Sequence, residues 1–264
     1  MIPQSPQDKD FPWWLLVAVA IGGWMLWQVL TDDIYTQVLQ TLGKGARVTI
    51  FVTLVGFTLA SALGLLLAVM SLSRFLVLRQ VARFYIEIVR GVPIIVLLLY
   101  VAFVLAPMLV AGWNGIRDVI GLDPIRPRDF SLMWRAIIAL TIGYSAFIAE
   151  VFRAGLQSIE KGQIEAAEAL GLGPWHRFRL IVFPQAFRRI LPPLGNDFVA
   201  MVKDSSLVSV LGVTDVTQLG KVTAAGNFRY FETYNVVALI YLMMTICLSL
   251  ALRRLEKHLR QKAG

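Results

Sequence analysis

The sequence predicts an all-α fold, a polytopic transmembrane helical bundle of about six spans. The first reason is composition: 57% of the 264 residues are hydrophobic and only 16% are charged, which is too apolar for a soluble domain of this length. The second is that several segments approach or exceed the ~20 apolar residues that cross a bilayer. The predicted spans are residues 13–30, 48–70, 84–105, 136–152, 191–211 and 234–252.

The first and fifth of these segments need separate arguments. Residues 13–30 are long for a cleaved signal peptide, follow an acidic flank and precede no small-residue cleavage site. We therefore interpret them as a retained span. Residues 191–211 are the least apolar span, because polar groups lie at their centre. Trp13, Trp14 and Tyr234 stand near predicted ends, where amphipathic rings prefer the membrane interface.

The distribution of positive charge predicts the orientation. The net charge is +8, and most Lys and Arg residues outside the spans fall on the same side as both termini. The positive-inside rule then places both termini, and the polar loop at residues 162–186, on the cytoplasmic side of the membrane. The basic tail at residues 257–264 is most simply a surface anchor to anionic lipid. We therefore assign no nucleic-acid partner.

Residues 162–186 form a polar loop between two apolar segments. We expect Gly162 to end the preceding helix in a left-handed conformation. Strong helix formers continue to Leu170, Gly171 stops that short helix, and Pro174 suits the first turn of another. An ordinary amphipathic loop is the alternative interpretation of this pattern.

Charged and helix-breaking residues occur together in the third predicted span. Glu87 and Arg90 are three residues apart and are placed to pair on one side of a helix. Gly91, Val92 and Pro93 follow. Because Pro93 has no N–H, we expect broken backbone that offers polar groups to a ligand. The alternative is that the cluster lies at the cytoplasmic interface, with Arg90 extended into water.

A second polar cluster lies in the fifth predicted span. A charged residue at bilayer depth costs roughly 2.5–3.5 kcal/mol, so these residues must face protein or a cavity. Asp197 and Asp204 are seven residues apart and share a helix face. Lys203 and Asp204 offer a cation for the carboxylate and an acceptor for the ammonium of an amino-acid zwitterion. A Lys203–aspartate pair without a ligand is the alternative. The whole cluster is Asn196, Asp197, Lys203, Asp204, Ser205 and Ser206.

The polar loop resembles the EAA loop of bacterial ABC importer permeases. The shared pattern is Glu-Ala-Ala, a Gly four residues after the last Ala, nine further residues and Ile-x-Leu-Pro, with Phe here in place of Leu. In that family the loop docks a separate ATPase. The resemblance implies a transport subunit, not an enzyme, with no metal or cofactor of its own because the partner uses the ATP. It assigns ATPase coupling to Glu165, Ala166, Ala167, Leu170, Gly171, Ile181, Phe183 and Pro184.

Further segments are similar to the polar amino acid uptake permeases of the histidine, glutamine, arginine and opine type. In that family the Arg-Gly-x-Pro and Lys-Asp-x-Ser segments line a mid-membrane substrate site, and the position of Asp197 helps to read the substrate side chain. Val92, Asp197 and Ser205 stand where Thr, Glu and Thr are frequent. The matching segments are residues 85–93, 146–159, 161–171, 184–186, 191–196 and 203–207.

This resemblance implies an importer that carries polar amino acids across the inner membrane by alternating access. The expected partners are cytoplasmic ABC ATPase subunits, a second permease (the same chain or a homologue), an extracytoplasmic amino-acid-binding protein and the lipid bilayer. The family core has five spans. We therefore divide the chain into residues 1–45, with an added N-terminal helix, residues 46–256, the permease domain, and the tail at 257–264.

Two other classes of function are weaker. An ion-gradient-driven secondary transporter or channel for a small polar solute would use Glu150, Asp197 and Asp204 to carry protons or cations. It leaves the EAA loop unexplained, and the sequence shows no inverted repeat. A membrane-embedded enzyme would need a nucleophile–base pair or a metal site, and His176 and His258 are isolated from other ligand residues.

Overall fold

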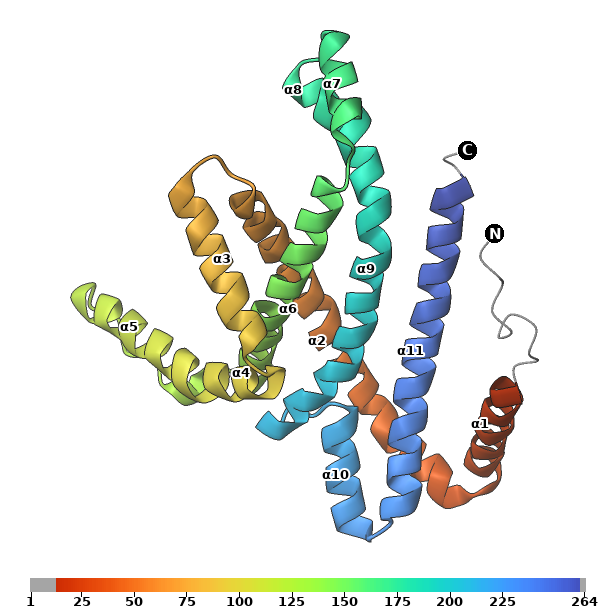
Figure 1. Ribbon diagram of the computed structural model, residues 1–264. Helices are drawn as coiled ribbons and strands as arrows, with labels where there is room; N and C mark the ends of the chain where they lie inside the picture. Colours follow the sequence, from red (N-terminus) through yellow and green to blue (C-terminus); the bar gives the residue numbers. More distant parts are fainter. Residues whose placement is uncertain (1–12, 262–264) are drawn as a thin grey trace.

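The computed structural model describes residues 13–261, in which all regular secondary structure is helical (Figure 1). The expected tails at residues 1–12 and 262–264 lie outside the described residues. The elements in chain order are α1 (Trp13–Thr31), α2 (Asp33–Ser71), α3 (Leu76–Gly91), α4 (Ile94–Tyr100), the π-helical turn η2 (Val101–Leu105), α5 (Ala106–Val119), the 3-10 turn η3 (Pro127–Asp129), α6 (Leu132–Gln157), α7 (Lys161–Ala169), α8 (Pro174–Arg177), the π-helical turn η4 (Phe178–Val182), α9 (Phe183–Asp204), the 3-10 helix η5 (Ser205–Leu211), α10 (Val216–Asn227) and α11 (Tyr230–Gln261).

Helix α2 packs closely against α6 along much of its length. A Cβ added to Gly64 of α2 would lie 2.9 Å from Cγ2 of Ile148 and 3.0 Å from the carbonyl oxygen of Ser145, both in α6. Glycine is therefore required for the two backbones to approach. In lipid, apolar side chains gain little by leaving the membrane, so close packing at small residues is what holds helices together.

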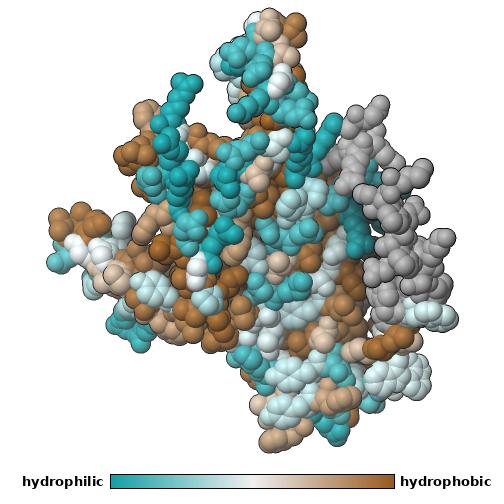
Figure 2. Space-filling model, viewed as in Figure 1, coloured by the Kyte–Doolittle hydropathy of each residue, from teal (hydrophilic) through white to brown (hydrophobic). Residues whose placement is uncertain are grey.

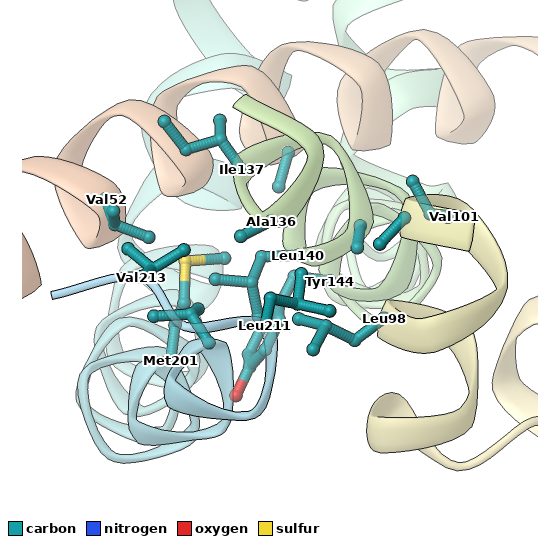
Figure 3. Close-up of a cluster of buried hydrophobic side chains, with 14 of the residues drawn as sticks. Val52, Leu98, Val101, Ala136, Ile137, Leu140, Tyr144, Met201, Leu211 and Val213 are labelled. Atoms are coloured by element: carbon teal, nitrogen blue, oxygen red, sulfur yellow. The ribbon is translucent and has the colours of Figure 1, made fainter. Parts of the chain in front are cut away.

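The largest buried cluster joins α2, α4, η2, α6 and the α9–η5 region (Figure 3). Val52, Leu140 and Met201 are fully buried in it, and Tyr144 of α6 is 3% exposed. Figure 3 shows the Tyr144 ring among these apolar side chains, with its hydroxyl oxygen at the edge of the group. This cluster fixes the position of α6 relative to the two segments that carry the predicted site.

The third predicted span, residues 84–105, is not a single helix. Helix α3 ends at Gly91, Val92 is extended at φ −100° and ψ 129°, and α4 begins at Ile94. Proline explains the break, because it lacks an N–H and disfavours helical geometry in the preceding residue. The apolar stretch long enough to cross a membrane is instead Ile94–Val119, which corrects the predicted boundary.

Within residues 13–261, four helical stretches are long and apolar enough to span a membrane by length and composition: Asp33–Ser71, Ile94–Val119, Leu132–Gln157 and Tyr230–Lys257. They contain all or part of the second, third, fourth and sixth predicted spans. The first predicted span lies in α1, whose apolar part is the shorter Val19–Thr31. The fifth predicted span lies in α9 and η5. Its polar residues explain why this segment is not among the four stretches that are apolar enough to span a membrane. The helical bundle of about six spans is confirmed.

One local prediction was wrong, and one helix was not predicted. Gly162 does not end a helix in a left-handed conformation, because it lies in the first turn of α7, and α6 stops earlier at Gln157. Residues 212–233, between the fifth and sixth predicted spans, contain α10, a helix that was not predicted. The Asp215 side chain caps α10 by accepting a hydrogen bond from the Gln218 N–H at 2.8 Å, a local signal that was overlooked.

The turns of the bundle divide between two ends. The α2–α3 turn, the α7–α8 loop and the C-terminal end of α11 point to one end of the molecule, and the α1–α2 and α10–α11 turns point to the other (Figure 1). Apolar side chains cover much of the surface between them (Figure 2); Leu66 of α2 and Ile246 of α11 are examples, at 55% and 48% exposed. Such exposure is expected of faces turned to lipid.

Candidate functional site: two loop-and-helix segments joined by α6

The structure places the first predicted polar cluster at the α3–α4 junction. Arg90 and Gly91 are the last two residues of α3, Val92 and Pro93 form the extended link, and all four are at least partly exposed. Glu87 and Arg90 do not form an ion pair, contrary to the expected pairing. The Arg90 guanidinium lies instead over the ring of Phe147 in α6, 5.7 Å from its centroid, where a cation–π interaction holds it.

The second predicted cluster lies where α9 passes into η5. Asn196, Asp197 and Lys203 are in α9, Asp204 is its last residue, and Ser205 and Ser206 open η5. Ser205 is fully buried, and its hydroxyl donates to the Val202 carbonyl oxygen at 2.7 Å. Its hydroxyl is therefore bonded to the last turn of α9.

Helix α6 connects the two clusters. The Tyr144 hydroxyl donates a 2.7 Å hydrogen bond to Oδ2 of Asp204. One turn later in α6, the ring of Phe147 lies 6.4 Å from that of Tyr144 and beneath Arg90. A continuous set of contacts thus runs from Arg90 through Phe147 and Tyr144 to Asp204. Neither aromatic residue was among the predicted site residues, because an aromatic pair in an apolar helix is indistinguishable from ordinary core.

The charges of the second cluster are not paired with each other. Lys203 is exposed, and it makes no ion pair with Asp204 or Asp197 within residues 13–261. The alternative of an internal Lys203–aspartate pair is therefore wrong. The buried Oδ2 of Asp197 accepts no hydrogen bond from any described residue. A buried carboxylate oxygen without a donor is unfavourable, so this oxygen needs a proton or a donor that the described residues do not supply.

The polar loop has the expected turn. Gly171 is in the left-handed region at φ +77°, and the Leu172 N–H bonds back to the Ala167 carbonyl oxygen at 3.1 Å, which closes the end of α7. Leu170 at the turn is 81% exposed and Ala167 is 3% exposed. Thus the short helices pack on each other while the turn projects into solvent.

The predicted coupling residues form one protruding unit. Glu168 of α7 pairs with Arg177 of α8, at 2.8 Å between Oε2 and a guanidinium nitrogen. Gln185 of α9 donates to Oε1 of Gln163 in α7 at 2.6 Å. Figure 1 shows α7 and α8 together at the tip of the molecule, above the end of α9. Of the coupling set, Glu165, Ala166, Leu170, Gly171 and Phe183 are exposed, Ile181 and Pro184 are partly buried and Ala167 is buried.

Helical residues are continuous from the coupling loop to the second polar cluster. Helix α8 starts at Pro174, the π-helical turn η4 follows without a break, and α9 continues to Asp204. At about 1.5 Å per residue, this helix is on the order of 45 Å long. At its middle, a Cβ on Gly155 of α6 would come within van der Waals overlap of Ile190, so the α6–α9 crossing is tight.

Comparison with known proteins shows the class of this chain. Residues 60–263 match the family of binding-protein-dependent transport system inner membrane components. The chain belongs to this family. Its members are ABC permease subunits, so this permease is a multi-pass membrane protein and a transport component, and ATP hydrolysis belongs to a separate ATPase chain.

Individual relatives agree with this assignment. The glutamine transport system permease protein GlnP of Escherichia coli (strain K12) is 37% identical over 82% of this chain and 92% of its own length. The probable amino-acid permease protein YxeN of Bacillus subtilis (strain 168) is 34% identical over 80% and 87% of the two chains. The solved structure of an amino acid ABC transporter with histidines superposes at a TM-score of 0.70 with 33% identity, covering 87% of this chain and 97% of that one.

These comparisons confirm the predicted resemblance and fold class. They favour the ABC permease over the ion-gradient-driven transporter and the membrane-embedded enzyme, neither of which accounts for the family match. As in other ABC importers, an ATPase and a substrate-binding protein are implied as partners of this permease.

Proposed function

We propose that this permease imports polar amino acids through a site formed by the α3–α4 junction, the α9–η5 region and α6. The substrate carboxylate is held by the cations Arg90 and Lys203, and its ammonium by Asp204. The supporting observation is the set of contacts from Arg90 through Phe147 and Tyr144 to Asp204. It brings a cation and a carboxylate from distant parts of the chain to one helix, as a zwitterion requires.

The role of Asp197 is to read the substrate side chain. Its buried Oδ2 has no donor in the described chain, and it lies seven residues before Asp204 on the same helix. A cationic or amide-bearing side chain would supply the missing donor. Such a role would offset the cost of carrying charged groups at membrane depth.

The EAA loop is the docking surface for the ATPase. Because α8, η4 and α9 form one uninterrupted helix, a displacement of the loop is carried directly to the residues around Asp204. Closure of two ATPases on ATP would then switch the site from outward to inward access by shifting the balance between two conformations. The protruding loop therefore acts as a lever on the substrate site.

A second permease, identical or homologous, completes the site. Arg90, Gly91, Asn196 and Lys203 are all exposed in the single chain, and charged groups at membrane depth need a protein or aqueous neighbour. An extracytoplasmic binding protein delivers the amino acid. The permease domain is residues 46–256, and its EAA loop and both termini face the cytoplasm of an inner membrane.

The orientation is tested separately with single cysteines. The native Cys247 is exposed and is first replaced by Ser. Arg177→Cys should then react with impermeant reagents only from the cytoplasmic side, and Asp123→Cys only from the other side. Labelling of both from one side would contradict the proposed arrangement.

The proposed function is tested by purifying the permease with its co-expressed ATPase and reconstituting the complex in nanodiscs. Addition of the binding protein loaded with a polar amino acid should stimulate ATP hydrolysis, and a panel of amino acids would identify the substrate. The same complex with a loop variant that fails to retain the ATPase serves as control. Uptake by the permease alone, driven by an ion gradient, would contradict the proposal.

A further inference from the structure

A polar cavity of about 340 Å³ lies between α3 and α6, on the EAA-loop side of Arg90 and Phe147. This volume falls in the range of small-molecule sites. Figure 2 shows hydrophilic side chains gathered on this face over α3 and α6. The side chains that line it are Ser71, Arg83, Ile86, Glu87, Glu150, Arg153 and Gln157. The two arginines and two glutamates leave the cavity without net charge.

The polar side chains on the α6 side of the cavity form hydrogen bonds with one another. Nε of Arg153 donates to Glu150 at 3.1 Å from Oε2, and a second guanidinium nitrogen donates to Oε1 of Gln157 at 2.8 Å. These contacts hold the three side chains along one face of α6. They form a fixed, neutral wall that still has carboxylate and amide oxygens available.

The charged side chains on the α3 side of the cavity have no such partners among the described residues. Arg83 and Glu87 are both exposed, and neither makes an ion pair or hydrogen bond through its side chain with any residue in the described range. They are four residues apart, so their Cβ atoms lie about 5–6 Å apart on one face. With the cation placed before the anion along the helix, the pair gains little from bonding to itself. A free cation and a free anion therefore face the same cavity.

We propose that this cavity is a second binding site for the amino-acid zwitterion, on the cytoplasmic side of the substrate site. Arg83 receives the carboxylate, Glu87 receives the ammonium, and the Glu150–Arg153 wall offers a polar surface to the side chain. This inference rests on the proposed amino-acid import. It extends that function by adding a step between the mid-membrane site and the cytoplasm.

The position of the cavity supports a role in release. Glu87 is one turn before Arg90 on α3, and Glu150 is one turn after Phe147 on α6. A substrate leaving the contacts at Arg90 and Phe147 meets the cavity next as it moves toward the EAA-loop end. Charged side chains here allow it to exchange one set of charge-assisted hydrogen bonds for another, which lowers the barrier to leaving.

The experiment measures how many amino acids bind to each permease chain. The permease–ATPase complex is studied in nanodiscs without nucleotide or binding protein, with radiolabelled L-glutamine and L-arginine as probes. We expect the wild type to bind a second amino acid per chain. Arg83→Gln and Glu87→Gln should each remove it, whereas Arg74→Gln, which neutralises an exposed arginine outside the cavity, should not.

The variant Asp204→Asn separates this inference from the proposed function. If Asp204→Asn removes one bound amino acid and Arg83→Gln removes the other, both the substrate site and the second site are supported. If the wild type binds a single amino acid that is lost in Asp204→Asn and unchanged in Arg83→Gln, the second site is overturned while the proposed site stands. A binding stoichiometry that changes only in Arg83→Gln would support the cavity and overturn the role of Asp204.

Discussion

The EAA loop and the substrate site are built in different ways. The loop is one stretch of chain whose contacts join neighbouring segments, such as Glu168 with Arg177 and Gln163 with Gln185. The substrate site depends on contacts between distant segments, since Tyr144 and Asp204 are 60 residues apart. A surface made from consecutive residues keeps its shape when helices shift, whereas a site assembled between helices changes. The difference fits the proposal that the loop drives the conformational change and the proposed substrate site responds to it.

The largest expected effect is at the substrate site. Asp204→Asn preserves volume but removes the charge that we propose holds the substrate ammonium. Loss of a charge-assisted hydrogen bond of about 1.5–3 kcal/mol should lower apparent affinity roughly ten- to a hundredfold in uptake assays. ATPase association and basal hydrolysis should be unchanged, because the loop is untouched. Asp123→Asn, on an exposed loop, is the matched control. Lost stability with unchanged affinity would show that Asp204 is structural only.

The next effect tests the loop. Gly171→Val forces a β-branched residue into φ +77°, a conformation that costs an L-residue roughly 1–2 kcal/mol or more. Displacing the turn should reduce uptake about five- to thirtyfold and weaken ATPase association, measured by co-purification, while amino-acid binding persists. Gly173→Ala is the control, because Gly173 has φ −64° and open space around it. Full uptake by Gly171→Val would remove the coupling assignment.

A smaller effect is expected one contact away from the substrate. Tyr144→Phe removes the hydroxyl that positions Asp204 but keeps the ring in the buried cluster. A hydrogen bond of about 0.5–1.5 kcal/mol predicts a two- to tenfold loss of affinity, at constant ATPase association. Tyr85→Phe provides the control, since that hydroxyl bonds at the α3–α6 interface to Ser145 Oγ at 2.9 Å and to the Ile142 carbonyl oxygen at 3.1 Å, neither of which belongs to the proposed substrate site. Equal losses in both variants would indicate packing damage rather than positioning of Asp204.

The smallest change in overall transport is expected from Asp197→Asn. The substitution should alter the ranking of cationic, neutral and acidic amino acids more than it lowers uptake of all of them. Competition profiles on stability-matched protein measure this ranking. An unchanged profile would mean that the unpartnered Oδ2 of Asp197 has no part in reading the side chain.

The sequence alone determined the features that depend on neighbouring residues. Apolar segment length predicted the helical membrane bundle, Gly171 predicted the left-handed turn, and Pro93 predicted the break before α4. Each follows from local covalent geometry or from the cost of exposing backbone to lipid. Motif spacing likewise identified the permease family before any three-dimensional comparison.

Tertiary structure decided which distant residues meet. Arg90 lies over Phe147 instead of pairing with Glu87. The partner of Asp204 is Tyr144, and not the neighbouring Lys203. Sequence spacing cannot reveal such contacts, because they depend on how α6 packs against α2, α4 and α9. That packing in turn depends on close approaches at Gly64 and Gly155, where shape rather than local propensity selects the partner.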